Sequence, residues 1–92
     1  MPRYMLSDGV LQADLHDEKV LLNQQTGLYH LLNATGAELV RLMGEGHTLD
    51  EAVDALADAT GMSRVRARED ARTFVDEMTR RGLLVEIEPE AT

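Results

Sequence analysis

The chain has 92 residues, 43% of them hydrophobic, and a formal net charge of −8. This length suits one small domain with its own core, and the lack of cysteine excludes disulfides and zinc–thiolate sites. The acidic balance disfavours nucleic-acid binding, because affinity for a phosphate backbone depends on Lys and Arg. Without an export signal or a membrane-length apolar run, we expect a cytoplasmic protein that does not enter a membrane.

Three short strands are predicted in the first third of the chain. Gly27 ends the loop before the third strand, where it can take the positive φ that such loops need. Tight connections of this kind predict an antiparallel meander, with Tyr4–Leu6 as a short extension ahead of it. The expected strands are Val10–Leu15, Lys19–Leu22 and Leu28–Leu32.

Three helices are expected to follow, each behind a polar residue that can cap its first turn. Glu51 lies three residues after Thr48, which is the spacing of a capping box. The expected caps are Asn33, Thr48 and Ser63, and the expected ends are Met43, Gly61 and Arg80-Arg81-Gly82. The third helix is expected to bury Val65, Ala67, Ala71, Phe74, Val75 and Met78.

The order of these elements predicts an α+β fold, with a three-stranded antiparallel sheet followed by three helices. Leu83–Ile87 is expected to form a short final strand or an extended tail, and Pro89–Thr92 to be frayed. No repeat or internal boundary is visible, so residues 1–92 are interpreted as one domain, ordered over about residues 5–88.

The sequence offers no set of residues for catalysis. His16, His30 and His47 lack the spacing of a helical metal site, and adjacent acidic residues on a helix do not face each other. Gly44 and Gly46 lack the third glycine and the lysine of a phosphate loop. We therefore expect neither an enzyme nor a metal or cofactor site, and His30 is interpreted as a core or groove residue.

The third strand, Leu28–Leu32, is a candidate binding edge. In a sequential sheet it lies at one side, where its free N–H and C=O groups can accept another chain. No Pro, Lys or inward charge protects it. Two interpretations stay open: a helix covers this edge, or a peptide adds to it as a further strand.

Several short motifs, taken in order, resemble the PqqD-like family of RiPP recognition elements, which bind precursor leader peptides. The resemblance covers about residues 5 to 88, is greatest with the freestanding leader-binding proteins of lasso-peptide clusters, and implies a winged-helix-like domain without catalysis, cofactor or metal. The motifs are Val20-Leu21-Leu22, Thr26-Gly27, Tyr29-x-x-Leu32-Asn33-x-x-Gly36, an apolar helix ending in Gly46, and Thr48-x-x-Glu51.

The resemblance also implies a site and partners. A leader peptide would pair antiparallel with the third strand, in a cleft against the third helix, and a leader peptidase and a macrolactam-forming cyclase would be the further partners. Leu28, His30 and Leu32 would share the face toward the cleft or the core, and His30 stands where many relatives carry a larger aromatic residue. The implied contacts are Leu28, Tyr29, His30, Leu31 and Leu32 on the strand, and Arg68, Ala71, Arg72, Val75 and Asp76 on the helix. Ala71 and Val75 are expected at a pocket floor, with a plain core role as the alternative.

Three other functions stay open at this point: an acidic winged-helix regulator that binds DNA, a PqqD-type chaperone for a radical enzyme, and a dimer joined through the edge strand. Charge disfavours the first, because a DNA-reading helix is basic. The four arginines of the third helix are instead interleaved with acids, which is typical of a solvated face. The residues are Arg64, Arg66, Arg68 and Arg72 among Glu69, Asp70 and Asp76.

Overall fold

Two antiparallel sheets and three helices make up the described part of the protein. The structure is a computed structural model, and it describes residues 3–16 and 18–87. The elements are β1 (Arg3–Leu6), β2 (Val10–Leu15), β3 (Glu18–Asn23), β4 (Leu28–Leu32), α1 (Ala34–Gly44), α2 (Leu49–Thr60), α3 (Arg64–Arg80) and β5 (Leu84–Ile87). This order confirms the predicted α+β class, with a winged-helix arrangement. The predicted fraying of Pro89–Thr92 lies outside the described residues.

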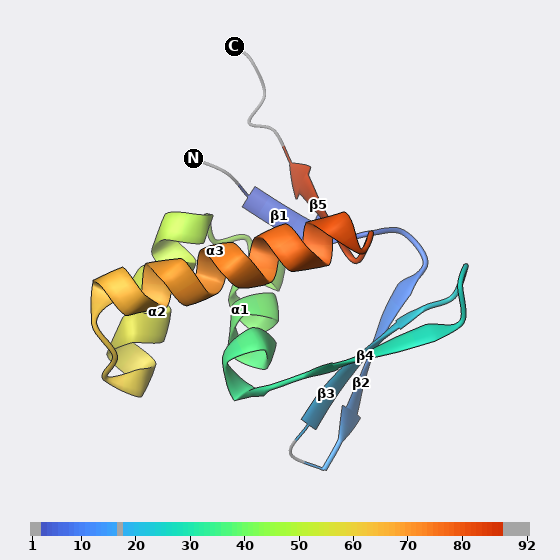
Figure 1. Ribbon diagram of the computed structural model, residues 1–92, viewed down its shortest axis with the longest axis horizontal. Coiled ribbons are helices and arrows are strands. Elements are labelled where there is room, and N and C mark those ends of the chain that lie inside the picture. Colours follow the sequence, from blue (N-terminus) through green and yellow to red (C-terminus); the bar gives the residue numbers. More distant parts are fainter. Residues whose placement is uncertain (1–2, 17, 88–92) are drawn as a thin grey trace.

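The three predicted strands form a sheet in the order β2-β3-β4, so β4 is an edge strand, as the sequence predicts. The register pairs Gln12 with Leu21, and Leu21 with His30. In Figure 1 this sheet extends from the helices toward the lower right, and β4 runs directly into α1. The sheet therefore presents one face to the helices and the other away from them.

A second sheet joins the two ends of the described chain. β1 pairs antiparallel with β5, with Tyr4 opposite Glu86 and Met5 opposite Val85, and Figure 1 shows the two strands side by side behind α3. The Tyr4 hydroxyl donates to a Glu86 carboxylate oxygen at 3.1 Å, and burial, followed by the interaction with Glu86, raises the pKa of Tyr4. The predicted short extension is thus a full partner strand.

Each helix begins at the predicted cap. The Asn33 side-chain oxygen accepts from the Gly36 N–H at 2.7 Å, and the Ser63 hydroxyl oxygen accepts from the Arg66 N–H at 3.2 Å. At α2, Thr48 and Glu51 exchange two such bonds, at 2.8 and 3.2 Å, which confirms the capping box. The bond from the Thr48 N–H holds the pKa of the Glu51 carboxyl below its usual range.

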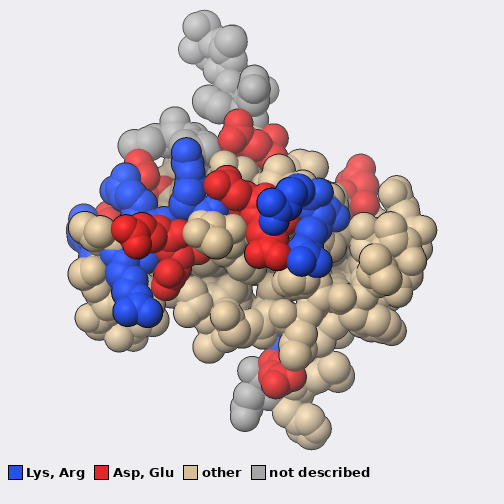
Figure 2. All heavy atoms as spheres, in the orientation of Figure 1, with Lys and Arg blue, Asp and Glu red and all other residues tan. Residues whose placement is uncertain are grey.

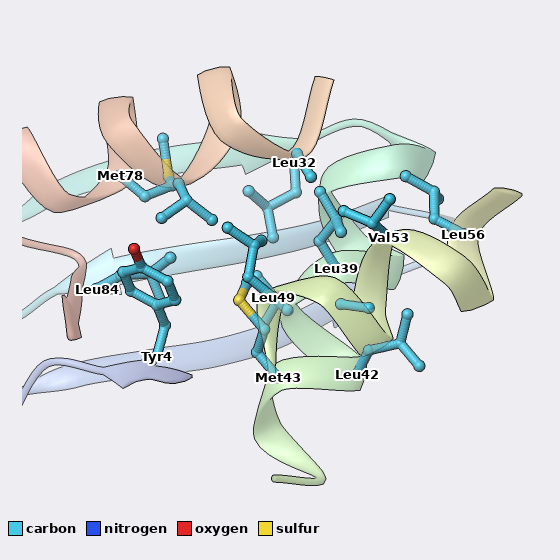
Figure 3. Close-up of a cluster of buried hydrophobic side chains, with 14 of the residues drawn as sticks. Tyr4, Leu32, Leu39, Leu42, Met43, Leu49, Val53, Leu56, Met78 and Leu84 are labelled. Atoms are coloured by element: carbon cyan, nitrogen blue, oxygen red, sulfur yellow. The ribbon is translucent and has the colours of Figure 1, made fainter. Parts of the chain in front are cut away.

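The core lies where the inner face of the β2-β3-β4 sheet, the three helices and the β1-β5 pair meet (Figure 3). Its largest fully buried side chains are Leu21, Leu39, Leu56, Met78, Leu84, Val53 and Val75. The prediction that Val65 is buried is wrong, because this side chain is 69% exposed. Val65 is two residues before Ala67 and so lies about 200° around the helix from the buried stripe. That stripe comprises Ala67, Ala71, Val75 and Met78.

Candidate peptide-binding site

The loop before β4 sets where this strand begins. The Asn23 side-chain oxygen accepts from the Gln25 N–H at 2.9 Å, and the Asn23 carbonyl accepts from the Gly27 N–H at 2.8 Å. Gly27 has a φ of 72°, a conformation that glycine adopts without steric cost. The Thr26 hydroxyl then accepts from the Leu28 N–H at 3.2 Å. Thr26 and Gly27 therefore turn the chain into β4.

The two faces of β4 differ in burial as its register requires. His30 is half-buried and Leu32 is buried in the core, on the face that looks toward the helices. Tyr29 and Leu31 point to the opposite face and are 74% and 57% exposed. Leu28 lies on the same face of β4 as His30 and Leu32, but its side chain is outside the core and is 70% exposed. Within residues 3–16 and 18–87, no strand pairs with the free side of β4.

A hollow of about 470 Å³ lies at the N-terminal end of β4, and we call it the N-terminal hollow. The strand supplies Leu28, Tyr29 and His30 to its wall, and the segment after α3 supplies Arg81 and Leu83. Asn23 and Thr26 of the preceding loop complete the lining. The Arg81 guanidinium is held by the Glu77 carboxylate at 2.8 Å. This hollow offers an apolar wall with one cation at its rim.

A second hollow, of about 330 Å³, lies just past the C-terminal end of β4. We call it the C-terminal hollow. It is lined by Asn33, Thr35, Gly36, Asp70, Thr73 and Phe74. Gly36 is essential to its shape, because a Cβ there would meet the Phe74 ring at 2.8 Å. Because one hollow lies at each end of β4, an extended chain laid along this strand has an opening at both of its ends.

The predicted helix contacts fall in three different places. Ala71 and Val75 are 0% and 1% exposed and belong to the core. Arg68 and Arg72 line a third hollow, between α2 and α3, together with Leu49 and Asp50. Asp76 is exposed on α3. Their part in binding stays a prediction.

The residues of α3 that line the β4 hollows were missed by the sequence analysis. They are Asp70, Thr73 and Phe74, with Arg81 and Leu83 after the helix end. One signal was available for Phe74: Gly36 is an unfavourable residue inside a helix, and its place in the first turn of α1 indicated a close neighbour.

Two arginines of α3 form ion pairs with α2. Arg64 lies 3.0 Å from an Asp54 carboxylate oxygen, and Arg68 lies 3.9 Å from one of Asp50. Figure 2 shows Lys and Arg mixed with Asp and Glu over the helices, while the surface at the right, over the β3-β4 turn, is largely free of charge. This arrangement does not make the uniform basic surface that a DNA-reading helix needs.

The described residues contain no cluster of three or more His, Asp or Glu that could hold a metal ion. No helix in the same part of the chain is long and apolar enough to cross a membrane. The features that this surface offers are therefore a free strand edge and the two hollows beside it, which suit an extended peptide.

Comparison with known proteins identifies the family. Residues 18–84 match the family described as coenzyme PQQ synthesis protein D (PqqD). A solved structure of TbiB1 in complex with the TbiA(beta) leader peptide is 35% identical, covers 96% of this chain and 99% of its own, and superposes with a TM-score of 0.81. The chain matches none of the curated proteins.

A second solved structure shares the fold. It is a lasso peptide synthetase B1 complexed with the leader peptide, with 24% identity, coverage of 90% of this chain and 98% of its own, and a TM-score of 0.85. The family match spans more than half of this chain and includes β4, α1, α2 and α3. The chain belongs to the PqqD family of RiPP recognition elements.

Proposed function

We propose that this protein binds the leader segment of a ribosomally made precursor peptide of the lasso type. The leader adds to β4 as a further antiparallel strand, contacts Leu28–Leu32 through the backbone, and places side chains in the two hollows. The observation that carries this proposal is the free edge of β4 between the N-terminal and C-terminal hollows. The leader complex of the 35% identical relative supports it.

The proposed role is that of an adaptor without catalysis of its own. It holds the leader for a leader peptidase, after which a macrolactam-forming cyclase acts on the core peptide. An adaptor needs a strand edge and shaped openings, and the edge of β4 with the two hollows supplies both.

Fluorescence anisotropy tests the proposal. A labelled synthetic leader of about 20 residues, taken from a lasso-type precursor of the same pathway, is titrated with the protein. We expect a Kd on the order of 0.1–10 μM, as for a short segment that orders on binding. A scrambled leader is the control and is expected to bind at least about tenfold more weakly, a difference of about 1.4 kcal/mol. Equal affinity for both peptides would contradict the proposal.

A further inference from the structure

The N-terminal and C-terminal hollows beside β4 carry charges of opposite sign. Among the described residues that line them, Arg81 supplies the one formal charge of the first hollow and Asp70 that of the second. The two residues are eleven positions apart, close to three turns of a helix, so they lie on the same side of α3 and its C-cap. The surface beside β4 therefore has a positive end and a negative end.

The polar groups of the N-terminal hollow keep hydrogen-bond donors for a ligand. The side-chain oxygens of Asn23 and Thr26 each already accept from the backbone N–H two residues later, at 2.9 and 3.2 Å. This leaves the amide N–H groups of Asn23 and the hydroxyl hydrogen of Thr26. The Arg81 guanidinium donates to the Glu77 carboxylate from Nε and Nη2 and, among the described residues, keeps its Nη1 donors. A carboxylate is the ligand group that these donors suit, because it only accepts.

The C-terminal hollow has the opposite chemistry. Asp70 is half-buried, and it has no ion-pair partner in the part of the chain that the structure describes. Arg64 and Arg68 of the same helix pair with α2 instead. Thr35 and Thr73 also line this hollow, and their hydroxyl groups can accept hydrogen bonds. The side chain of a Lys or Arg, which only donates, suits this hollow.

An antiparallel leader meets the two charges in a fixed order. β4 runs from the N-terminal hollow to the C-terminal hollow, so a strand paired antiparallel with it reaches the C-terminal hollow first. The hollows are centred about five residues of extended chain apart, roughly 17 Å. Both are bordered by α3 or the segment after it. Leader side chains that point to this one side are an even number of residues apart, which gives a separation of about four or six residues.

We propose that the two hollows select leaders with a Lys or Arg on the N-terminal side of the paired strand and an Asp or Glu about four to six residues later. Asp70 holds the basic residue and Arg81 the acidic one. The proposal rests on the proposed function, because the hollows flank the strand that the leader would form. A parallel strand of the same leader would bring like charges together, so Asp70 and Arg81 fix the direction and the register of the leader.

The test exchanges charges on both partners. The leader is compared with a charge-inverted copy, in which each Lys or Arg is replaced by Glu and each Asp or Glu by Lys. The protein variant is Asp70→Lys with Arg81→Glu. The matched control, Asp58→Lys with Arg80→Glu, makes the same exchange at exposed positions outside both hollows. Both variants keep the net charge of the wild type, circular dichroism checks that they fold, and anisotropy measures leader affinity.

We expect the wild type and the control to bind the charge-inverted leader at least about fivefold more weakly than the natural one, since each partly exposed pair contributes a few-fold. The Asp70→Lys, Arg81→Glu variant is expected to prefer the charge-inverted leader, a reversal that structural damage would not produce. If this variant does not fold, Asp70→Lys alone is titrated with a leader inverted only at its Lys and Arg residues.

The inference would be overturned by equal affinity of the wild type for both leaders, or by an unchanged preference in the Asp70→Lys, Arg81→Glu variant. A leader that binds well but lacks this order of charges would also overturn it. In each of these cases the leader still binds, so the proposed function stands. A wild type that binds the natural leader no more tightly than the scrambled one would instead count against the proposed function.

Discussion

At the scale of single residues, the contact between Gly36 and Phe74 joins the start of α1 to α3. Both residues line the C-terminal hollow. Glycine usually weakens a helix, and here it admits an aromatic ring that a Cβ would displace. The shape of this end of the site therefore depends on a residue without a side chain.

Gly36→Ala is expected to destabilise the protein by about 1 kcal/mol. Overpacking against the Phe74 ring costs about 1–3 kcal/mol, which outweighs the gain of up to about 1 kcal/mol from alanine in a helix. Because the ring must move, leader affinity is also expected to fall. Urea unfolding and leader anisotropy measure the two effects.

Gly44→Ala in the same helix is the matched control. A Cβ at Gly44 meets nothing within 4 Å, so this variant is expected to be as stable as the wild type or more stable. If both variants behave alike, the Phe74 contact does not constrain the site.

The capping box of α2 gives a prediction about pH. The Glu51 carboxyl has its pKa lowered in the folded protein by the bond from the Thr48 N–H. Its contribution to stability is therefore present above about pH 4.3 and is lost as the pH falls below that value. Glu51→Gln keeps an acceptor without this titration. Melting temperatures from pH 7 to pH 3 are expected to fall less steeply in Glu51→Gln, and parallel profiles would contradict the account.

At the scale of elements, the backbone N–H groups of β4 have two roles, pairing with β3 and pairing with the leader, and these roles alternate from one residue to the next. In an antiparallel strand, neighbouring N–H groups point in opposite directions, one toward the partner strand and the next toward the open edge. Tyr29 and His30 are such neighbours. One of the two N–H groups supports the pairing with β3, and the other is available to the leader.

Tyr29→Pro and His30→Pro are expected to separate these roles. Proline removes one donor. The variant that loses the outward donor is expected to stay folded and to bind the leader at least about tenfold more weakly, whereas the other is expected to unfold at a lower temperature because it loses a bond to β3. Circular dichroism melts and anisotropy distinguish them. Two folded variants with full leader affinity would show that the edge of β4 is not used.

Most of the elements could be predicted because their signals are local. Caps at Asn33, Thr48 and Ser63, the positive φ at Gly27 and the apolar periods each depend on a few neighbouring residues. The pairing of β1 with β5 could not be predicted, because it joins residues about eighty positions apart and each strand is only four residues long. Nothing in either segment specifies the other.

The residues of the candidate site could be predicted from the sequence for β4 but not for α3. A sheet meander places β4 at an edge whatever the details of packing. For α3, periodicity groups Ala71 and Val75 on one stripe but does not say whether a peptide or the core covers it. The structure places both in the core. Which α3 residues line the C-terminal hollow, Thr73 and Phe74 among them, depends on the angle between α3 and α1.

At the scale of the whole molecule, the charge of −8 is not concentrated at the proposed site. The N-terminal hollow has Arg81 at its wall and the C-terminal hollow has Asp70. With one charge of each sign and mostly apolar contacts from β4, binding should depend little on long-range attraction. The net negative charge is instead expected to affect the association of larger protein partners.

Salt weakens interactions between exposed charges, and few such interactions are expected between the leader and this site. Leader affinity is therefore expected to change by less than about threefold between roughly 50 and 300 mM NaCl. Anisotropy titrations at several salt concentrations measure this, with a neutral crowding agent as a viscosity control. A steep loss of affinity with salt would indicate that Arg68 and Arg72, beside α2, contact the leader.

The central claim is that the leader becomes a strand beside β4. A titration of ¹⁵N-labelled protein with the leader, followed by NMR, tests it most directly. The account predicts that the amides of Leu28–Leu32 shift most and that the outward-facing ones exchange more slowly with solvent when the leader is bound. It is contradicted if these amides stay unchanged while those of Leu49, Asp50 and Arg68, around the hollow between α2 and α3, shift instead.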